Sequence, residues 1–226
     1  MRRDDLAAGA AIGLGIALFA IPAFMNGFSA LTASHPYAMS FVKFALLATF
    51  GECLGLRIAT GVYNRPGFGI LPRALVWGFL GMGIKLAFTI FVSGVPVAMR
   101  ELGLAVPDQV LSQGPFAWTL LTSFCISLGL NCIFAPLFMT LHRVTDAHIL
   151  ATGGSLRGFF SPIEAGRLLQ EVNWTSLWGF VFKKTIPFFW IPAHSITFIL
   201  PQHFQVLFAA LLGVVLGLIL AVASRK

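Results

Sequence analysis

Long apolar runs that contain almost no charged residues constrain this chain more than any other feature. A helix needs about 20 consecutive apolar residues to cross the hydrocarbon core of a bilayer. Five runs meet or approach this length and a sixth, shorter one contains prolines; they cover about residues 6–31, 39–60, 71–99, 116–141, 185–200 and 204–223. The pattern predicts an all-α fold, a polytopic transmembrane helix bundle with six membrane segments in a single domain, 1–226.

The composition excludes most other classes of protein. Of the 226 residues, 58% are hydrophobic and only 10% are charged, whereas a soluble domain has about 25% charged residues. Too few charges remain to cover a water-facing surface, so we exclude a soluble enzyme, a disordered protein, a disulfide scaffold and a coiled coil. The cysteines are three in number and lie inside apolar runs, which argues against a disulfide framework and against a zinc site.

The distribution of basic residues predicts the orientation of the bundle. Cytoplasmic loops of membrane proteins collect Lys and Arg. With six segments and an inner N-terminus, twelve of the fifteen basic residues lie on the inner side and only Arg100 lies in an outer loop. We therefore expect both termini on this positive inner side. The net charge of +7 then reflects membrane topology and not a nucleic-acid partner.

The longest polar stretch, 143–173, is expected to be an inner-side loop with a short amphipathic helix near 162–172. Ser161 and Glu164 have the spacing of a capping box around Pro162. Apolar residues then recur as in a helix that lies in the membrane interface, although a helix that docks a partner protein is the alternative. Four residues after this loop are expected to anchor the next segment at the interface: Trp174, Trp178, Lys183 and Lys184.

Ionisable groups inside the apolar runs are the main candidates for function, because each costs at least about 2.5–3.5 kcal/mol at the bilayer centre. Glu52 lies near the middle of the second run and Lys85 near the middle of the third, so we expect an ion pair between them. Such a pair either only fixes helix register or lines an aqueous cavity as a gate. Asn131 is expected to hydrogen-bond across helices, and His194 is either a hydrogen-bonded interior histidine or a pH-sensitive pore group. The pore or gate candidates are Glu52, Lys85, Asn131 and His194.

Glycines at small-residue spacing are expected to mark close helix packing. They are Gly51, Gly55, Gly81, Gly83, Gly213 and Gly217. Neither the histidine spacings nor any other motif forms a metal-ligand set, a nucleophile constellation or a phosphate-binding loop. We therefore expect no catalytic activity, no metal and no cofactor.

One C-terminal stretch resembles a known family. Its residues are Asn173-Trp174, then Trp190-Ile191-Pro192-Ala193-His194-Ser195-Ile196-Thr197-Phe198, and then Pro201-Gln202-His203-Phe204-Gln205-Val206-Leu207-Phe208. They are similar to the C-terminal signature of the family named for Mpv-seventeen and the peroxisomal membrane protein of twenty-two kilodaltons. His35-Pro36, Gly51-Glu52 and Arg73 resemble earlier elements of the same family. The chain departs from the family pattern at four positions, with His194 for Gln, Thr197 for Asn, Gln205 for Arg and Glu52 for Asp.

The resemblance implies a weakly selective channel for small metabolites in a mitochondrial inner or peroxisomal membrane, and a bacterial plasma membrane fits the chain equally well. Together with the polar groups inside the runs, it leads us to predict a channel or facilitator for small polar solutes or ions. The alternative is a structural or assembly subunit of a membrane complex with no transport activity of its own. The expected partners are the lipid bilayer and the solute, and association into a homo-oligomer or a larger membrane complex is left open.

Overall fold

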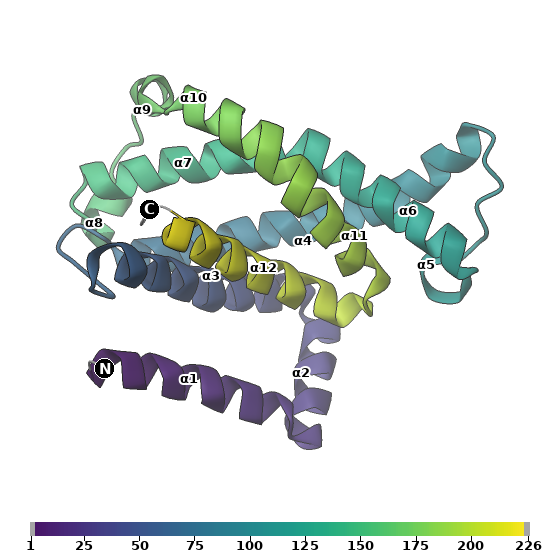
Figure 1. Ribbon diagram of the computed structural model, residues 1–226, viewed down its shortest axis with the longest axis horizontal. Coiled ribbons are helices and arrows are strands. Elements are labelled where there is room, and N and C mark those ends of the chain that lie inside the picture. Colours follow the sequence, from purple (N-terminus) through teal and green to yellow (C-terminus); the bar gives the residue numbers. More distant parts are fainter. Residues whose placement is uncertain (1–2, 224–226) are drawn as a thin grey trace.

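The computed structural model describes residues 3–223, and these residues form an all-helical bundle with no strand among them (Figure 1). Four helices are long and apolar enough to cross a membrane, or five if a bent pair at the N-terminus counts as one span. The all-α membrane bundle is thus confirmed, but the six-segment count is not. The four helices are α3 (Pro36–Thr60), α4 (Ile70–Glu101), the continuous helix Phe116–Ala151, and α12 (Gln202–Ala223).

The first apolar run is two helices and not one continuous helix. Helix α1 (Arg3–Phe19) and helix α2 (Pro22–Ser34) meet at an angle of 86°. The break lies at Pro22, which has no N–H to donate and which holds the preceding Ile21 in an extended conformation. Figure 1 shows α1 running along α3 while α2 lies across the end of the bundle.

Helix α1 is held to the bundle mainly near its two ends. Among the described residues it buries none of its side chains. Arg57 of α3 donates two hydrogen bonds of 2.7 Å to the Asp5 carboxylate, and Tyr63 donates a third of 3.1 Å. Burial, followed by the hydrogen bond to Asp5, raises the pKa of Tyr63. The other end of α1 is joined to the bundle through α2.

The fourth run continues ten residues beyond its predicted end. Helix α6 (Phe116–Gly129) passes through the π-helical turn η1 (Leu130–Phe134) into α7 (Ala135–Ala151) without a break. The π turn lies beside Pro136, whose missing N–H removes one α-helical hydrogen bond. The last part of α7 is polar in composition but stays helical because one of its faces is buried. The residues of that face are Val144, His148 and Ile149.

The expected inner-side loop is therefore shorter than predicted and is itself partly helical. It contains α8 (Leu156–Phe159) and α9 (Ala165–Glu171). The capping box predicted at Ser161 does not form, because its hydroxyl donates to the Gly158 carbonyl at 2.5 Å and α9 starts only after Glu164. Glu164 instead pairs with Arg167 one turn later. Leu168 is the buried apolar residue of α9.

The fifth segment begins eleven residues earlier than predicted. Helix α10 (Trp174–Ser176), the π-helix η2 (Leu177–Trp190) and α11 (Ile191–Ile199) follow one another without a break and form one long helix. Asn173 caps its start by accepting a hydrogen bond of 2.9 Å from the Ser176 N–H. The four residues expected as interface anchors, Trp174, Trp178, Lys183 and Lys184, are all exposed on it. A further short helix, α5 (Val110–Gln113), lies in the connection before α6.

The largest helix–helix contact is between α3 and α4, and α12 packs against α3 on another side. Two of the predicted packing glycines lie in these contacts. A Cβ at Gly81 would lie 2.6 Å from Phe44 Cβ and 2.7 Å from the Ser40 carbonyl oxygen, and a Cβ at Gly51 would lie 3.2 Å from the Val214 Cα. The other four are not at close contacts, because a Cβ would meet nothing within 4 Å at Gly55, Gly83, Gly213 or Gly217.

Candidate functional site

A partly open cavity of about 280 Å³ lies among α3, α4, α12 and the two helices that contain π turns. Most of its wall is apolar and aromatic, as is usual for a small-molecule site. Three of the glycines without close neighbours, Gly55, Gly213 and Gly217, are part of this wall. Their missing side chains leave space in the cavity and do not bring helices together. The polar residues of the wall are Glu52, Asn131, His142 and His194.

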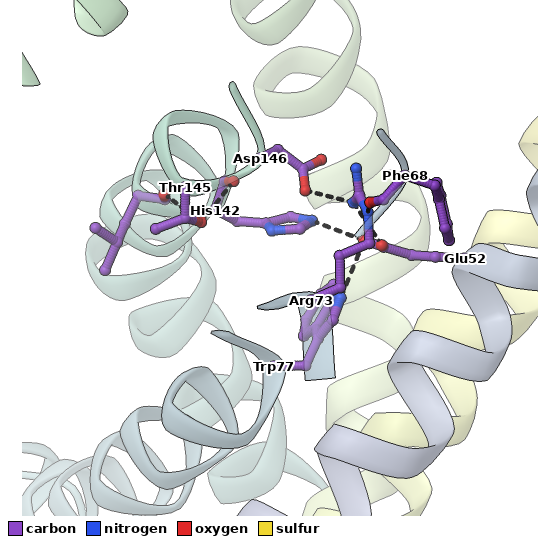
Figure 2. Close-up of polar contacts among 8 residues, drawn as sticks. Glu52, Phe68, Arg73, Trp77, His142, Thr145 and Asp146 are labelled. Carbon is purple, nitrogen blue, oxygen red and sulfur yellow. Dashed lines mark hydrogen bonds and ion pairs between the residues drawn. The ribbon is translucent and has the colours of Figure 1, made fainter. Parts of the chain in front are cut away.

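Glu52 belongs to a cluster of charged and polar groups at one end of the cavity (Figure 2). Arg73 Nη1 lies 2.6 Å from Glu52 Oε2 and 2.5 Å from Asp146 Oδ1, so one guanidinium nitrogen serves two carboxylates. Trp77 Nε1 donates to Glu52 Oε1 at 3.0 Å, and His142 Nε2 lies 3.6 Å from the same oxygen. The cluster joins α3, α4 and α7.

The start of α4 is built so that Arg73 turns inward. Gly69, at φ 73°, precedes the helix in a left-handed conformation, and a Cβ there would lie 2.7 Å from Ile149. Arg73 Nε donates to the carbonyl of Phe68 at 2.8 Å, and the Phe68 ring lies 4.5 Å from the guanidinium carbon. Arg73 is therefore only 6% exposed, whereas sequence reasoning counted it among the basic residues of an inner loop.

The ion pair predicted between Glu52 and Lys85 does not form. Lys85 Nζ donates to Thr89 Oγ1 at 3.1 Å, one turn further along the same helix, and Lys85 is not part of the cavity wall. Both residues lie near the middle of their helices, as predicted, but the helices are rotated so that only Glu52 faces the interior. Lys85 is therefore removed from the set of cavity residues, and His142 and Arg73 join the site.

The sequence contained one local signal for the missed residues. Arg73 and Trp77 are four residues apart on α4, and His142 and Asp146 are four residues apart on α7. This spacing places both members of each pair on one helix face. The second pair was overlooked because 143–173 was expected to be a loop.

Asn131 and His194 meet at another part of the cavity. Asn131 Nδ2 donates to the Ser127 carbonyl at 2.8 Å and lies 3.2 Å from His194 Nδ1. Asn131 Nδ2 also donates to Ser127 Oγ at 3.2 Å, so the amide contacts both the side chain and the backbone of Ser127 as well as the His194 ring. A second hydrogen bond joins α6 to α11, because Ser127 Oγ donates to the Ile191 carbonyl at 2.7 Å.

Two side chains of the cavity wall hold buried polar atoms that have no hydrogen-bond partner among the described residues. They are His142 Nδ1 and Trp190 Nε1. Buried polar groups are nearly always hydrogen-bonded to protein or water. Both atoms are closed off from the cavity space itself, and three further buried hydroxyls away from the wall share this property, so these atoms do not mark a position for a ligand.

The carboxylates and the histidine of the cluster lie close enough to be considered as a metal site. One ligand atom each of Glu52, His142 and Asp146 lies within 4.8 Å of the others. However, Arg73 Nη1 already bonds both carboxylates. The place that a metal ion would take between them is filled by the protein's own cation.

Comparison of the chain with family models, with curated proteins and with solved structures finds no match. The resemblance of 173–208 to the Mpv-seventeen family therefore stays a prediction. The structural features that bear on function are the cavity and the groups in its wall.

Proposed function

We propose that the protein is an integral membrane channel or facilitator of weak selectivity for small polar solutes or ions, with the central cavity on the solute path. The proposal rests on one observation: polar groups line the same cavity at two well-separated positions along the helix axis. Asn131 and His142 both line it and lie eleven residues apart on one continuous helix, which corresponds to about 16 Å along the helix axis. This distance is about half the thickness of the hydrocarbon core.

The cluster around Glu52 would act as the gate of such a path. The Arg73 guanidinium of α4 joins Glu52 of α3 to Asp146 of α7, so a movement of any one of these helices relative to the other two changes contacts of the cluster. The gate and path residues are then Glu52, Asn131, His142 and His194. Lys85 is excluded from this set.

We place both termini on the inner side of the membrane. In Figure 1, α1 begins and α12 ends at the end of the bundle where α3 ends and α4 begins. Arg57 and Arg65 lie in that region, in agreement with an inner face that carries basic residues. Arg2, Arg225 and Lys226, which also entered the prediction, lie outside the described residues. The host membrane is bacterial, mitochondrial or peroxisomal in this proposal.

Filling the cavity is expected to abolish transport without unfolding the protein. In the double variant Gly213→Leu, Gly217→Leu, the new side chains enter the cavity, since a Cβ at either position meets nothing within 4 Å. Flux into liposomes of glycerol, glycine and methylammonium, measured by stopped-flow light scattering, should fall at least tenfold for whichever solutes the wild type transports. Gly83→Leu is the matched control, because Gly83 is a helical glycine with open space that does not line the cavity. Equal flux through the filled variant, or no flux above empty liposomes for the wild type, would refute the proposal.

A second candidate function, an assembly subunit of a membrane complex, is favoured by Lys85. This residue lies near the middle of α4 and outside the cavity wall, and its hydrogen bond within the described residues is to Thr89. A lone ammonium at this depth is costly. A membrane helix of another chain with a carboxylate near its middle would supply the missing charge, whereas a symmetric second copy would bring two lysines together.

The assembly candidate makes its own prediction. Lys85→Met should leave the isolated protein folded, because no acidic group within the described residues loses a partner. The same change should release any partner chain that co-purifies with the wild type from its native membrane, as read by native mass spectrometry. Arg100→Met, at the exposed end of the same helix, should release nothing. A wild-type protein that purifies alone from that membrane contradicts this candidate.

A further inference from the structure

We infer that the cavity binds an organic monocation, an ammonium group attached to an apolar body, with the cationic group at Glu52. The inference rests on the proposed function, since it names the class of solute that the same cavity accepts. Two features of the described residues support it: the charge of the cluster and the aromatic wall beside it.

The cluster at the Glu52 end has an excess of negative charge. Glu52 and Asp146 contribute two carboxylates, and Arg73 contributes one guanidinium that bonds both of them. The two carboxylates and the one guanidinium have a formal charge of −1 in total, and Arg57 does not offset it because it is paired with Asp5. A charge that is removed from water needs a partner of opposite sign. Glu52 is the only carboxylate among the described residues of the wall, so a cation inside the cavity meets this group.

Aromatic rings form much of the wall next to this carboxylate. The Trp77 indole donates to Glu52 and also lies 6.2 Å from the Phe44 ring and 6.3 Å from the Phe138 ring, measured between ring centroids. The faces of such rings attract cations, and the attraction grows where water is excluded. Phe134 and Trp190 extend the aromatic wall. A carboxylate beside aromatic side chains suits an ammonium group, while the apolar remainder of the cavity suits its hydrocarbon part.

Other solute classes fit these features less well. A bare metal ion would have to displace Arg73 from between the two carboxylates and would leave the apolar wall unused. An anion would add to the negative charge at Glu52. A neutral polar solute would not compensate that charge, and few polar groups of the wall could replace its lost hydration.

A pair of isosteric probes tests the charge requirement directly. Benzyltrimethylammonium and neopentylbenzene have nearly the same shape and differ in whether the central atom is a cationic nitrogen or a neutral carbon. We expect isothermal titration calorimetry on the full chain in a non-ionic detergent to show the cation binding at least tenfold more tightly. Equal affinity of the two probes, or no binding of the cation, would overturn the inference.

Single neutralising variants then locate the charge. Glu52→Gln and Asp146→Asn each remove one negative charge from the cluster. Glu52 lies in the cavity wall, whereas Asp146 lies outside the wall and is paired with Arg73. Both variants should weaken benzyltrimethylammonium binding at least tenfold. Glu164→Gln, an exposed carboxylate of the inner-side segment, should bind as the wild type does. Unchanged binding by Glu52→Gln contradicts the inference. Should a variant fail to fold, the isosteric comparison on the wild type still decides.

The outcomes separate this inference from the proposed function. If the cation does not bind but cavity filling still abolishes flux of another solute, the transport proposal holds and the assigned solute class is wrong. If the cation binds and no solute crosses the membrane, the cavity is a binding site without a transport role.

Discussion

Replacing Arg73 by methionine is expected to destabilise the protein by about 3–5 kcal/mol, the range found when one partner of a buried ion pair is removed. Arg73 Nη1 bonds both Glu52 and Asp146, so the variant leaves two carboxylates facing each other without a cation. The Phe68 carbonyl also loses its donor. The expected result is a lower midpoint in thermal unfolding, followed by size-exclusion chromatography in detergent, and a lower yield of monodisperse protein.

A matched arginine controls for the loss of charge alone. Arg100 lies near the other end of the same helix, and its ion pair with Asp108 is 3.8 Å long and largely exposed. Exposed pairs contribute little, so Arg100→Met should shift the stability by less than about 1 kcal/mol. Similar losses of stability in Arg73→Met and Arg100→Met would show that the buried Arg73 cluster stabilises the fold no more than an exposed ion pair does.

A triple variant separates electrostatics from packing. Adding Glu52→Gln and Asp146→Asn to Arg73→Met removes both unpaired carboxylates while keeping side chains of similar size. Because the charged cluster costs desolvation in the first place, this neutral version should recover most of the lost stability. A triple variant as unstable as Arg73→Met would mean that the guanidinium acts through its packing against Phe68 and not through its charge.

Much of the helical framework was predictable because the bilayer requires long apolar helices. The exception in the first run had a visible cause, since Pro22 interrupts it, yet the length of the run concealed the break. The polar half of α7 could not be assigned from composition, because its helix is stabilised by burying Val144, His148 and Ile149 against other helices. Such tertiary burial is absent from any local pattern.

The candidate site was only half predictable for a related reason. Position along a helix gives the depth of Glu52 and Lys85, but not the rotation of each helix about its axis. The rotation is set by packing, which turns Glu52 inward and leaves Lys85 beside Thr89. Arg73 was missed because its long side chain reaches from the first turn of α4 to a carboxylate deeper in the bundle. The Asn131 and His194 contact depends on two helices whose pairing the sequence does not specify.

Glycine spacing shows most clearly that a local pattern does not specify which residues meet a neighbouring helix. Gly81 and Gly83 are only two residues apart, yet their surroundings are opposite. A Cβ at Gly81 would lie 2.7 Å from the backbone oxygen of Ser40, but one at Gly83 would meet nothing within 4 Å. Gly51 and Gly55 differ in the same way, although they share one small-residue motif. The motif marks a helix face on which close approach can occur, and only the neighbouring helix decides which glycine is needed.

Gly81→Leu is therefore expected to destabilise the protein by about 3 kcal/mol or more, at the upper end of what overpacking costs. The clash is with backbone and with the Phe44 Cβ, neither of which can rotate away, so α3 and α4 must separate along the largest contact of the bundle. Gly83→Leu should leave stability unchanged or raise it by up to about 1 kcal/mol through helix propensity. Both variants add the same side chain to the same helix, so thermal unfolding in one detergent compares them directly. Equal stability of the two would show that α3 and α4 do not approach each other at Gly81, and the position of the Glu52 cluster between them would then have to be revised.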